Sequence, residues 1–176
     1  MTDAALTPPT SEADLLALLD RLGVQYTLHR HKPVFTVEES AEIEHSMPGW
    51  HTKNLFLKEK KGGFWLICCE AKRQVKVRDV VRAAGGKNPS FGKPEDLWRL
   101  MGLRPGSVCP FGLVNDAARE ISLILDAEMM RAEIVNFHPL HNEATVALAP
   151  ADLLRFLEHT GHAPALVEFA DLPVQD

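Results

Sequence analysis

Residues 106–116 read GSVCPFGLVND, and these residue types constrain the backbone strongly for so short a stretch. Gly106 and Gly112 permit φ angles that other residues avoid and let a ligand approach the main chain. Pro110, like Pro105 just before the stretch, fixes φ and removes an amide donor, so the remaining N–H groups are held in place. Such a loop could present amides to a carbonyl oxygen. It also suits a tight connection between a helix and a strand, and both interpretations stay open.

The segments on either side predict the elements that this loop joins. Residues 94–101 carry proline in the first turn and are followed by Gly102, which is typical of a complete helix. Residues 121–125 form a short apolar run typical of a buried strand. The same criteria predict further helices at 12–22, 37–45 (with Thr36 in a capping box), 77–84, 127–132 and 150–160, and strands at 24–30, 53–58, 64–70, 134–137, 145–148 and 166–169.

These helices and hairpin-like strands are interspersed without strict alternation. That order predicts an α+β fold with a mixed, largely antiparallel sheet flanked by helices. The chain has 176 residues, which is typical of one domain. We expect a flexible tail at 1–10 and a single domain over 11–170. In the last helix, Leu153, Leu154 and Leu157 are expected to face the core.

The composition excludes several classes of protein. The longest apolar runs are far shorter than the ~18 residues that a membrane span needs, and the polar start of the chain lacks a signal-peptide pattern. We therefore expect a cytoplasmic protein with no membrane partner. Cys68 and Cys69 are neighbours on a predicted strand and should point to opposite faces. Three cysteines without close pairing predict neither a disulfide framework nor a zinc-cysteine site.

Several side chains could carry chemistry. Lys53 stands at the predicted start of a strand, where it could contact a phosphate or simply be solvated. His138 ends an apolar strand and could orient a substrate or move a proton, and it could equally be a hydrogen-bonded turn residue. His141 and Asn142 follow closely, but the histidine spacing does not predict a metal site. Cys109 is predicted to be a packed residue rather than a nucleophile paired with His138.

The densest basic stretch covers residues 72–87, which hold six lysine and arginine residues in a chain of net charge −5. It could meet a phosphate backbone, or it could be a solvated face. The acidic balance of the whole chain disfavours broad, non-specific binding of nucleic acid. It leaves open a protein that grips only one end of a nucleic acid.

Four segments follow one another along the chain in an order that is specific as a set: HKPVFTVEES, HTKNLFLKEKKGGFWLI, LWRLMGLRPGSVCPFGLVND and VNFHPLHNEATVAL. Together they closely resemble the YbaK and prolyl-tRNA-synthetase-associated domain family, over about residues 15–160. That resemblance implies a curved mixed sheet and the hydrolysis of mischarged tRNA(Pro). The second and fourth segments favour the branch of free-standing Ala-tRNA(Pro) deacylases. Cys109 stands where the family pattern suggests threonine or serine.

The resemblance also implies roles for residues and partners. Lys53 would hold the phosphate near the terminal adenosine, Asn54 would shape the site beside it, and His138 would line the amino-acid pocket. The loop from Gly106 to Gly112 would surround the aminoacyl carbonyl. The remaining residues that we assign to the site from the matching motifs are Ser107 as a catalytic loop residue, and His31, Val108, Pro110, Phe111, Asn115, Asp116 and Asn142 as substrate-binding residues.

In the mechanism that the resemblance implies, water is the nucleophile, the tRNA 2′-hydroxyl assists, and neither a metal nor another cofactor is needed. An aminoacyl ester is already activated, so positioning and oxyanion stabilisation could supply most of the catalysis. A synthetase site that binds proline discriminates only weakly against the smaller alanine, by ~1–3 kcal/mol of binding free energy per missing methylene. A second, smaller pocket could therefore admit alanine, exclude proline and remove the wrong amino acid.

The alternatives are editing of another mischarged tRNA (Cys, Ser or Thr) and a non-catalytic tRNA- or DNA-binding module. Prolyl-tRNA synthetase is a possible partner.

Overall fold

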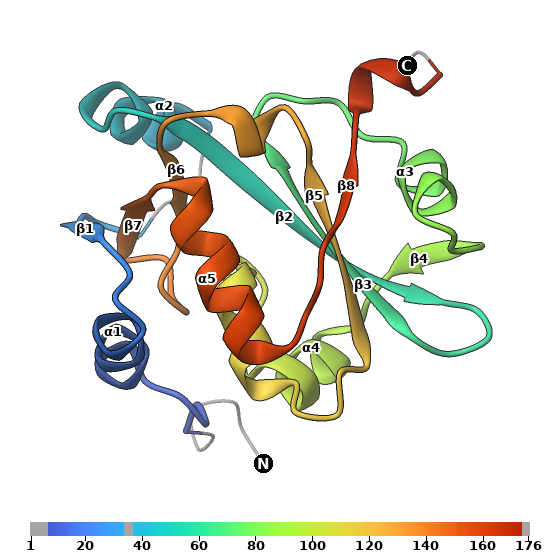
Figure 1. Ribbon diagram of the computed structural model, residues 1–176, viewed down its shortest axis with the longest axis horizontal. Coiled ribbons are helices and arrows are strands. Elements are labelled where there is room, and N and C mark those ends of the chain that lie inside the picture. Colours follow the sequence, from blue (N-terminus) through green and yellow to red (C-terminus); the bar gives the residue numbers. More distant parts are fainter. Residues whose placement is uncertain (1–6, 34–36, 174–176) are drawn as a thin grey trace.

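The computed structural model describes residues 7–33 and 37–173 of the chain. Its elements confirm the predicted α+β fold, in which helices flank a mixed sheet (Figure 1). The helices are α1 (Glu12–Arg21), α2 (Val37–Ser46), α3 (Val77–Ala83), α4 (Pro94–Met101) and α5 (Pro150–Thr160), with 3₁₀ turns η2 (Pro110–Asn115), η3 (Met129–Arg131) and η4 (Phe169–Asp171). The strands are β1 (Tyr26–Arg30), β2 (Trp50–Glu59), β3 (Phe64–Glu70), β4 (Pro89–Phe91), β5 (Ile121–Asp126), β6 (Val135–Phe137), β7 (Ala144–Leu148) and β8 (Ala165–Val167).

The sheet runs in the order β1-β7-β6-β2-β3-β5-β8, and β4 pairs with β2 off this path. The pairs β1–β7, β6–β7, β2–β3 and β2–β4 are antiparallel, whereas β2–β6, β3–β5 and β5–β8 are parallel. Strand β2 joins the two halves of the sheet because Trp50 and His51 pair with β6, and the residues from Thr52 onward pair with β3. The turn between β2 and β3 forms the predicted hairpin.

The sheet buries both faces. Successive side chains on a strand point to opposite sides, and the neighbouring cysteines confirm this. Cys68 belongs to the larger core, with Phe56 and Leu66, whereas Cys69 belongs to a smaller core with Leu57. Helices α1, α4 and α5 cover the larger core, and α3 covers the smaller one.

The helix ends follow the sequence signals. Ser11 caps α1 by accepting a hydrogen bond from the Asp14 amide, and the Asp14 side chain accepts one from the Ser11 amide. Such caps typically contribute ~1 kcal/mol. Gly102 after α4 and Gly161 after α5 adopt left-handed φ values of 63° and 80°, which glycine accepts without strain.

Some predicted boundaries differ from the structure. Strand β4 was not predicted, since its three residues include a proline, and the helix predicted at 127–132 is only the 3₁₀ turn η3. Leu154 is 41% exposed, so the prediction that it faces the core is wrong. Leu153, Phe156 and Leu157 are buried instead, because positions three and four apart share one face of a helix.

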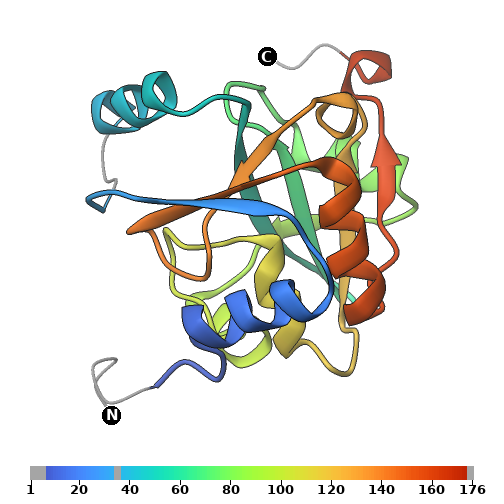
Figure 2. The same cartoon turned by 60° about the vertical axis from the view of Figure 1, so that its left-hand side comes forward.

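The bounds predicted for the tail and the domain stay predictions. The expected cap at Thr36 and most of the expected tail, residues 1–6, lie outside the described residues. Within the described part of the tail, the Thr10 hydroxyl donates a hydrogen bond to Asn115 Oδ1. Figure 2 shows α2 beyond the start of β2, apart from the other helices.

Candidate functional site

A cavity of about 960 Å³ lies between α2 and the sheet, within the volume range of small-molecule sites. Six parts of the chain contribute its walls: His31 after β1, α2, the first half of β2 with Gly49 before it, the end of β3 and the loop after it, Glu128 after β5, and the ends of β6 and β7. All of them except α2 belong to the sheet or its adjoining loops. The cavity therefore forms where a helix stands over the sheet without filling the space beneath it.

The alternation of strand residues makes this wall of the cavity polar. On β6, Val135 and Phe137 belong to the larger core. The residues between and after them, Asn136 and His138, alternate with these core residues and supply polar groups to the cavity lining, to which Phe137 also contributes. His51, which pairs with Asn136 on the neighbouring strand, lines it as well.

Lys53 lies inside β2, three residues beyond its start, and its ammonium donates a hydrogen bond to the Arg73 carbonyl oxygen. The Arg73 guanidinium is itself fixed at two points. Its Nε donates to Asp126 Oδ2 at 2.8 Å, and its Nη2 donates to Glu128 Oε2 at 2.7 Å. Asp126 is fully buried and also accepts hydrogen bonds from the backbone amides of Glu70, Glu128 and Met129. We call Arg73, Asp126 and Glu128 the arginine clamp, since together they fix the carbonyl that holds Lys53.

Two histidines lie at the other side of the cavity, with ring centroids 6.3 Å apart. His138 Nδ1 donates to the Ala144 carbonyl at 3.0 Å. Burial lowers the pKa of His138, and the positive charge that His31 and His141 can carry lowers it further. A neutral His138 with its proton on Nδ1 keeps an acceptor lone pair on Nε2. His31 Nε2 lies 2.8 Å from the Thr145 hydroxyl.

Two buried carboxamide oxygens on the cavity wall lack partners. Among the described residues, Asn54 Oδ1 and Asn136 Oδ1 have no hydrogen-bond partner. Asn136 Nδ2, by contrast, donates to the carbonyls of Pro48 and Trp50, both at 3.1 Å. Buried acceptors without a donor are uncommon in folded proteins and require an explanation.

The structure brings four of the predicted site residues together at this cavity: Lys53, Asn54, His31 and His138. The loop residues Gly106, Ser107, Val108, Pro110, Phe111 and Gly112 are not part of its lining. Phe111 packs edge-on against Phe137 and Phe156 in the larger core. Gly112 sits where a Cβ would lie 2.7 Å from Leu103. The second half of the loop therefore packs the core, in place of the expected cradle around a carbonyl.

Cys109 connects this loop to the cavity's edge. The backbone amides of Leu140, Gly112 and Phe111 lie near the Cys109 sulfur and favour its thiolate, and Leu140 is two residues after His138. The thiol is fully buried, and burial raises its pKa to about 11. A thiol in this state is a poor nucleophile, which agrees with its predicted role as a packed residue.

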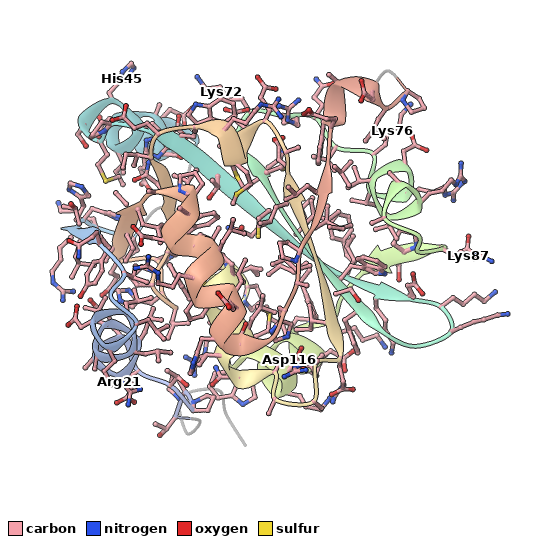
Figure 3. All side chains as sticks on the ribbon, in the orientation of Figure 1. Arg21, His45, Lys72, Lys76, Lys87 and Asp116 are labelled. Atoms are coloured by element: carbon pink, nitrogen blue, oxygen red, sulfur yellow. The ribbon has the colours of Figure 1, made fainter. Side chains whose placement is uncertain are left out.

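The remaining predicted residues lie outside the cavity. Asn115 bonds Thr10 and the Met101 carbonyl. Asp116 is buried, accepts from the Ile121 amide at 2.9 Å and lies 2.9 Å from His162 Nε2. Figure 3 places Asp116 at the opposite end of the molecule from His45 and Lys72, which line the cavity. Asn142, in the turn after β6, also lies outside its lining.

The basic stretch divides between two places. Lys72 and Arg73 line the cavity, whereas Arg78, Arg82 and Lys87 line a second hollow of about 510 Å³ at the end of α3. Figure 3 shows Lys87 on the far side of the molecule from α2. Only the start of the stretch could therefore touch a ligand in the main cavity.

Across residues 7–33 and 37–173 we found no group of three or more side chains arranged to hold a metal ion. In the same ranges, no helix combines the length and apolar character of a membrane span.

Sequence reasoning missed Asn136, Thr145 and the residues of α2 that line the cavity. A signal for Asn136 was present. In the apolar run around it, strand alternation puts Asn136 on the face opposite its two apolar neighbours. The contribution of α2 depends on tertiary packing and had no local signal.

Comparisons with known proteins show the family to which the chain belongs. Residues 31–156 match the family model described as aminoacyl-tRNA editing domain. The chain belongs to the aminoacyl-tRNA editing domain family. All four predicted residues that meet at the cavity fall within the matched range.

Relatives within this family are similar over nearly their whole length. The chain is 36% identical to the zebrafish (Danio rerio) "prolyl-tRNA synthetase associated domain-containing protein 1", covering 94% of this chain and 91% of that protein. It is 31% identical to the "prolyl-tRNA editing protein ProX" of Acetoanaerobium sticklandii, covering 88% and 94%. A crystal structure described as a candidate trans-editing enzyme for prolyl tRNA synthetase superposes with a TM-score of 0.66 over 93% of this chain and 99% of that one. Its 21% identity shows the shared fold alone.

Proposed function

We propose that this protein is a trans-editing deacylase that hydrolyses mischarged Ala-tRNA(Pro). The observation that carries the proposal is the meeting of Lys53, Asn54, His31 and His138 at one cavity of about 960 Å³. Family membership and the names of the prolyl-tRNA-related proteins support the same reaction class. The substrate would be the acceptor end of the tRNA, with its aminoacyl ester inside the cavity.

Lys53 would bind a phosphate near the terminal adenosine. Its ammonium has three donors, of which the Arg73 carbonyl takes one, so donors remain for a phosphate oxygen. Lys72 lies at the same side of the cavity and adds positive charge. A compact ammonium held at a fixed place can orient the ester, and orientation supplies much of the rate enhancement in such reactions.

The reaction would proceed by attack of water on the ester carbonyl carbon. The bond between that carbon and the ribose oxygen then breaks, the ribose oxygen takes a proton, and alanine and uncharged tRNA are released. His138 is suited to accept a hydrogen bond from water or substrate, since its neutral ring offers Nε2. We propose that the tRNA 2′-hydroxyl assists.

The loop from Gly106 to Gly112 would support this site indirectly. It does not line the cavity, but the Cys109 sulfur lies near the Leu140 amide in the turn after His138. We therefore propose that the loop stabilises the turn that follows His138, rather than stabilising the oxyanion with its own amides.

A panel of aminoacyl-tRNAs tests the proposal. Purified protein is incubated with tRNA(Pro) carrying alanine, proline, cysteine, serine or threonine, and the release of each amino acid is followed. Faster loss of alanine than of proline supports the proposal. Faster loss of another amino acid makes the protein an editing enzyme of different specificity, and no acceleration for any substrate refutes deacylation.

A non-catalytic nucleic-acid-binding module is the second candidate. The observation in its favour is the basic hollow at Arg78, Arg82 and Lys87, away from the main cavity. Binding through such contacts weakens steeply with salt. Tight, strongly salt-dependent binding of uncharged RNA or DNA without any deacylation would favour it. Association with prolyl-tRNA synthetase is a further proposal, suggested by the relatives' names and testable by co-purification.

A further inference from the structure

Asn136 on β6 presents an acceptor whose direction is fixed by its own amide group. The residue is 3% exposed, and its Nδ2 donates to the carbonyls of Pro48 and Trp50 at 3.1 Å each. A carbonyl oxygen can only accept. Flipping the carboxamide would place its oxygen against two other oxygens, so the hydrogen-bond network itself assigns the position of Oδ1.

That oxygen is left without a donor. Within the described part of the chain, nothing donates to Asn136 Oδ1 although it is buried. A buried acceptor that loses its water without gaining a partner is costly to the fold. Asn136 lines the cavity, so a bound molecule can supply the missing donor there. The amide nitrogen thus secures the junction between α2 and β2, while the oxygen remains a buried acceptor without a partner on a residue of the cavity wall.

The neighbourhood favours a donor from the amino acid. Asn136 lies on β6, two residues before His138, which follows the strand, whereas Lys53 lies on β2 next to the loop after β3. If Lys53 holds the phosphate, the amino acid would lie towards β6. An α-ammonium group carries three donors and no acceptor, and the lowered pKa of His138 favours a neutral ring that does not itself repel such a group.

We propose that Asn136 Oδ1 accepts a hydrogen bond from the α-ammonium group of the bound aminoacyl ester. This inference rests on the proposed deacylase function and makes Asn136 a substrate-binding residue. It also gives a reason for the burial of an unpartnered oxygen on the cavity wall. An ester that lacks the amino group would gain nothing from Asn136.

The test compares two esters and three proteins. The esters are alanyl-tRNA(Pro) and propionyl-tRNA(Pro), which differ by the amino group. The proteins are the wild type, Asn136→Ala and Asn136→Asp. Both variants lose the donors to Pro48 and Trp50, but only Asn136→Asp keeps an acceptor. We expect Asn136→Ala to slow alanyl release on the order of tenfold or more relative to propionyl release. Asn136→Asp sets its second oxygen against the carbonyls of Pro48 and Trp50, so it should be less stable than the wild type, but in its folded form it should restore part of that preference for the alanyl ester.

A matched control separates binding from a structural role. The Thr52 hydroxyl donates to the Asn136 carbonyl at 2.6 Å, so Thr52→Val disturbs the same junction of β2 and β6 without touching the carboxamide. It should affect both esters to the same degree. Thermal denaturation of every variant shows whether each is folded at the assay temperature.

Two outcomes would overturn the inference. Equal slowing of both esters by Asn136→Ala would mean that the residue only secures the α2–β2 junction. The second outcome concerns the slowing caused by Asn136→Ala. If that slowing disappeared with a substrate ending in 2′-deoxyadenosine but persisted with the propionyl ester, the group that donates to Asn136 would be the ribose hydroxyl. If the wild type released no alanine at all, the proposed function itself would fail, which is a different result from either.

Discussion

Replacing Asp126 by asparagine removes one charge from the arginine clamp while keeping the shape of the side chain. In the native protein the two Asp126 oxygens accept from the Arg73 guanidinium and three backbone amides. In asparagine one of those oxygens is replaced by an NH2 group. That group would face N–H groups that donate to Asp126 in the native protein, so donor would oppose donor. Asp126 is fully buried, so no solvent is at hand to replace the lost contacts.

The size of the effect follows from the geometry. Removing one partner from a buried ion pair costs about 3–5 kcal/mol. The Arg73 side chain is 21% exposed and keeps its contact with Glu128, so we expect about 2–3 kcal/mol, as for hydrogen bonds to charged groups. In a domain of this size that loss lowers Tm by about 4–12 °C. Urea denaturation should show a lower midpoint at an unchanged m-value.

The exposed pair Arg131–Glu168, with 2.9 Å between Nη1 and Oε2, provides the control. Glu168→Gln should leave the urea midpoint nearly unchanged, because exposed pairs contribute little. Asp126→Asn should also slow deacylation by loosening Lys53, and it should add nothing further in a Lys53→Ala background. An Asp126→Asn protein as stable and as active as the wild type would refute the clamp. So would an equal slowing in the presence and absence of Lys53.

Three further predictions concern the junction, the thiols and the pH dependence. Gly49→Ala should destabilise the protein clearly more than Gly63→Ala: both have φ near +90° (99° and 89°), but only at Gly49 would a Cβ lie 2.7 Å from another side chain; equal urea midpoints would contradict this. At pH 8 a thiol reagent such as DTNB should label no cysteine before unfolding and all three after it, because all are buried and the pKa values of Cys69 and Cys109 are raised to about 12 and 11. His138 has a lowered pKa in the folded state, so its contribution to stability is present above its ordinary pKa of about 6.5 and declines as the pH falls below that value. The wild type should therefore lose stability relative to His138→Gln between pH 7.5 and 5.5. A constant difference in stability between the two proteins would show that folding does not shift the pKa of His138.

Strong local signals predicted much of the fold. Capping at Ser11, the stops at Gly102 and Gly161, and the turn between β2 and β3 are set by residues next to one another in sequence. The three-residue strand β4 could not be predicted, because it is formed by pairing with β2, which lies some thirty residues earlier.

The site was predictable in part, for a physical reason. Lys53 and His138 belong to motifs that resemble a known family, and both line the cavity. The motif around Phe111 and Asp116 is equally recognisable, yet Phe111 packs in the larger core and Asp116 is buried at the end of the molecule distant from α2. A motif indicates that its residues share a structural or functional role, but it does not show on which face of the sheet each side chain lies. Strand alternation marks Asn136 as facing away from its apolar neighbours, but its place beside His51 depends on the pairing of β6 with β2.

The most direct test of the account is the rate of alanine release from Ala-tRNA(Pro) by three proteins: the wild type, Lys53→Ala and Lys60→Ala. Lys60 is an exposed lysine in the turn after β2, remote from the lining of the cavity. The account predicts rapid release by the wild type and Lys60→Ala, and a loss of roughly tenfold or more in Lys53→Ala, as for a hydrogen bond to a charged group. No release above the spontaneous rate by the wild type, or equal rates for the two lysine variants, would contradict it.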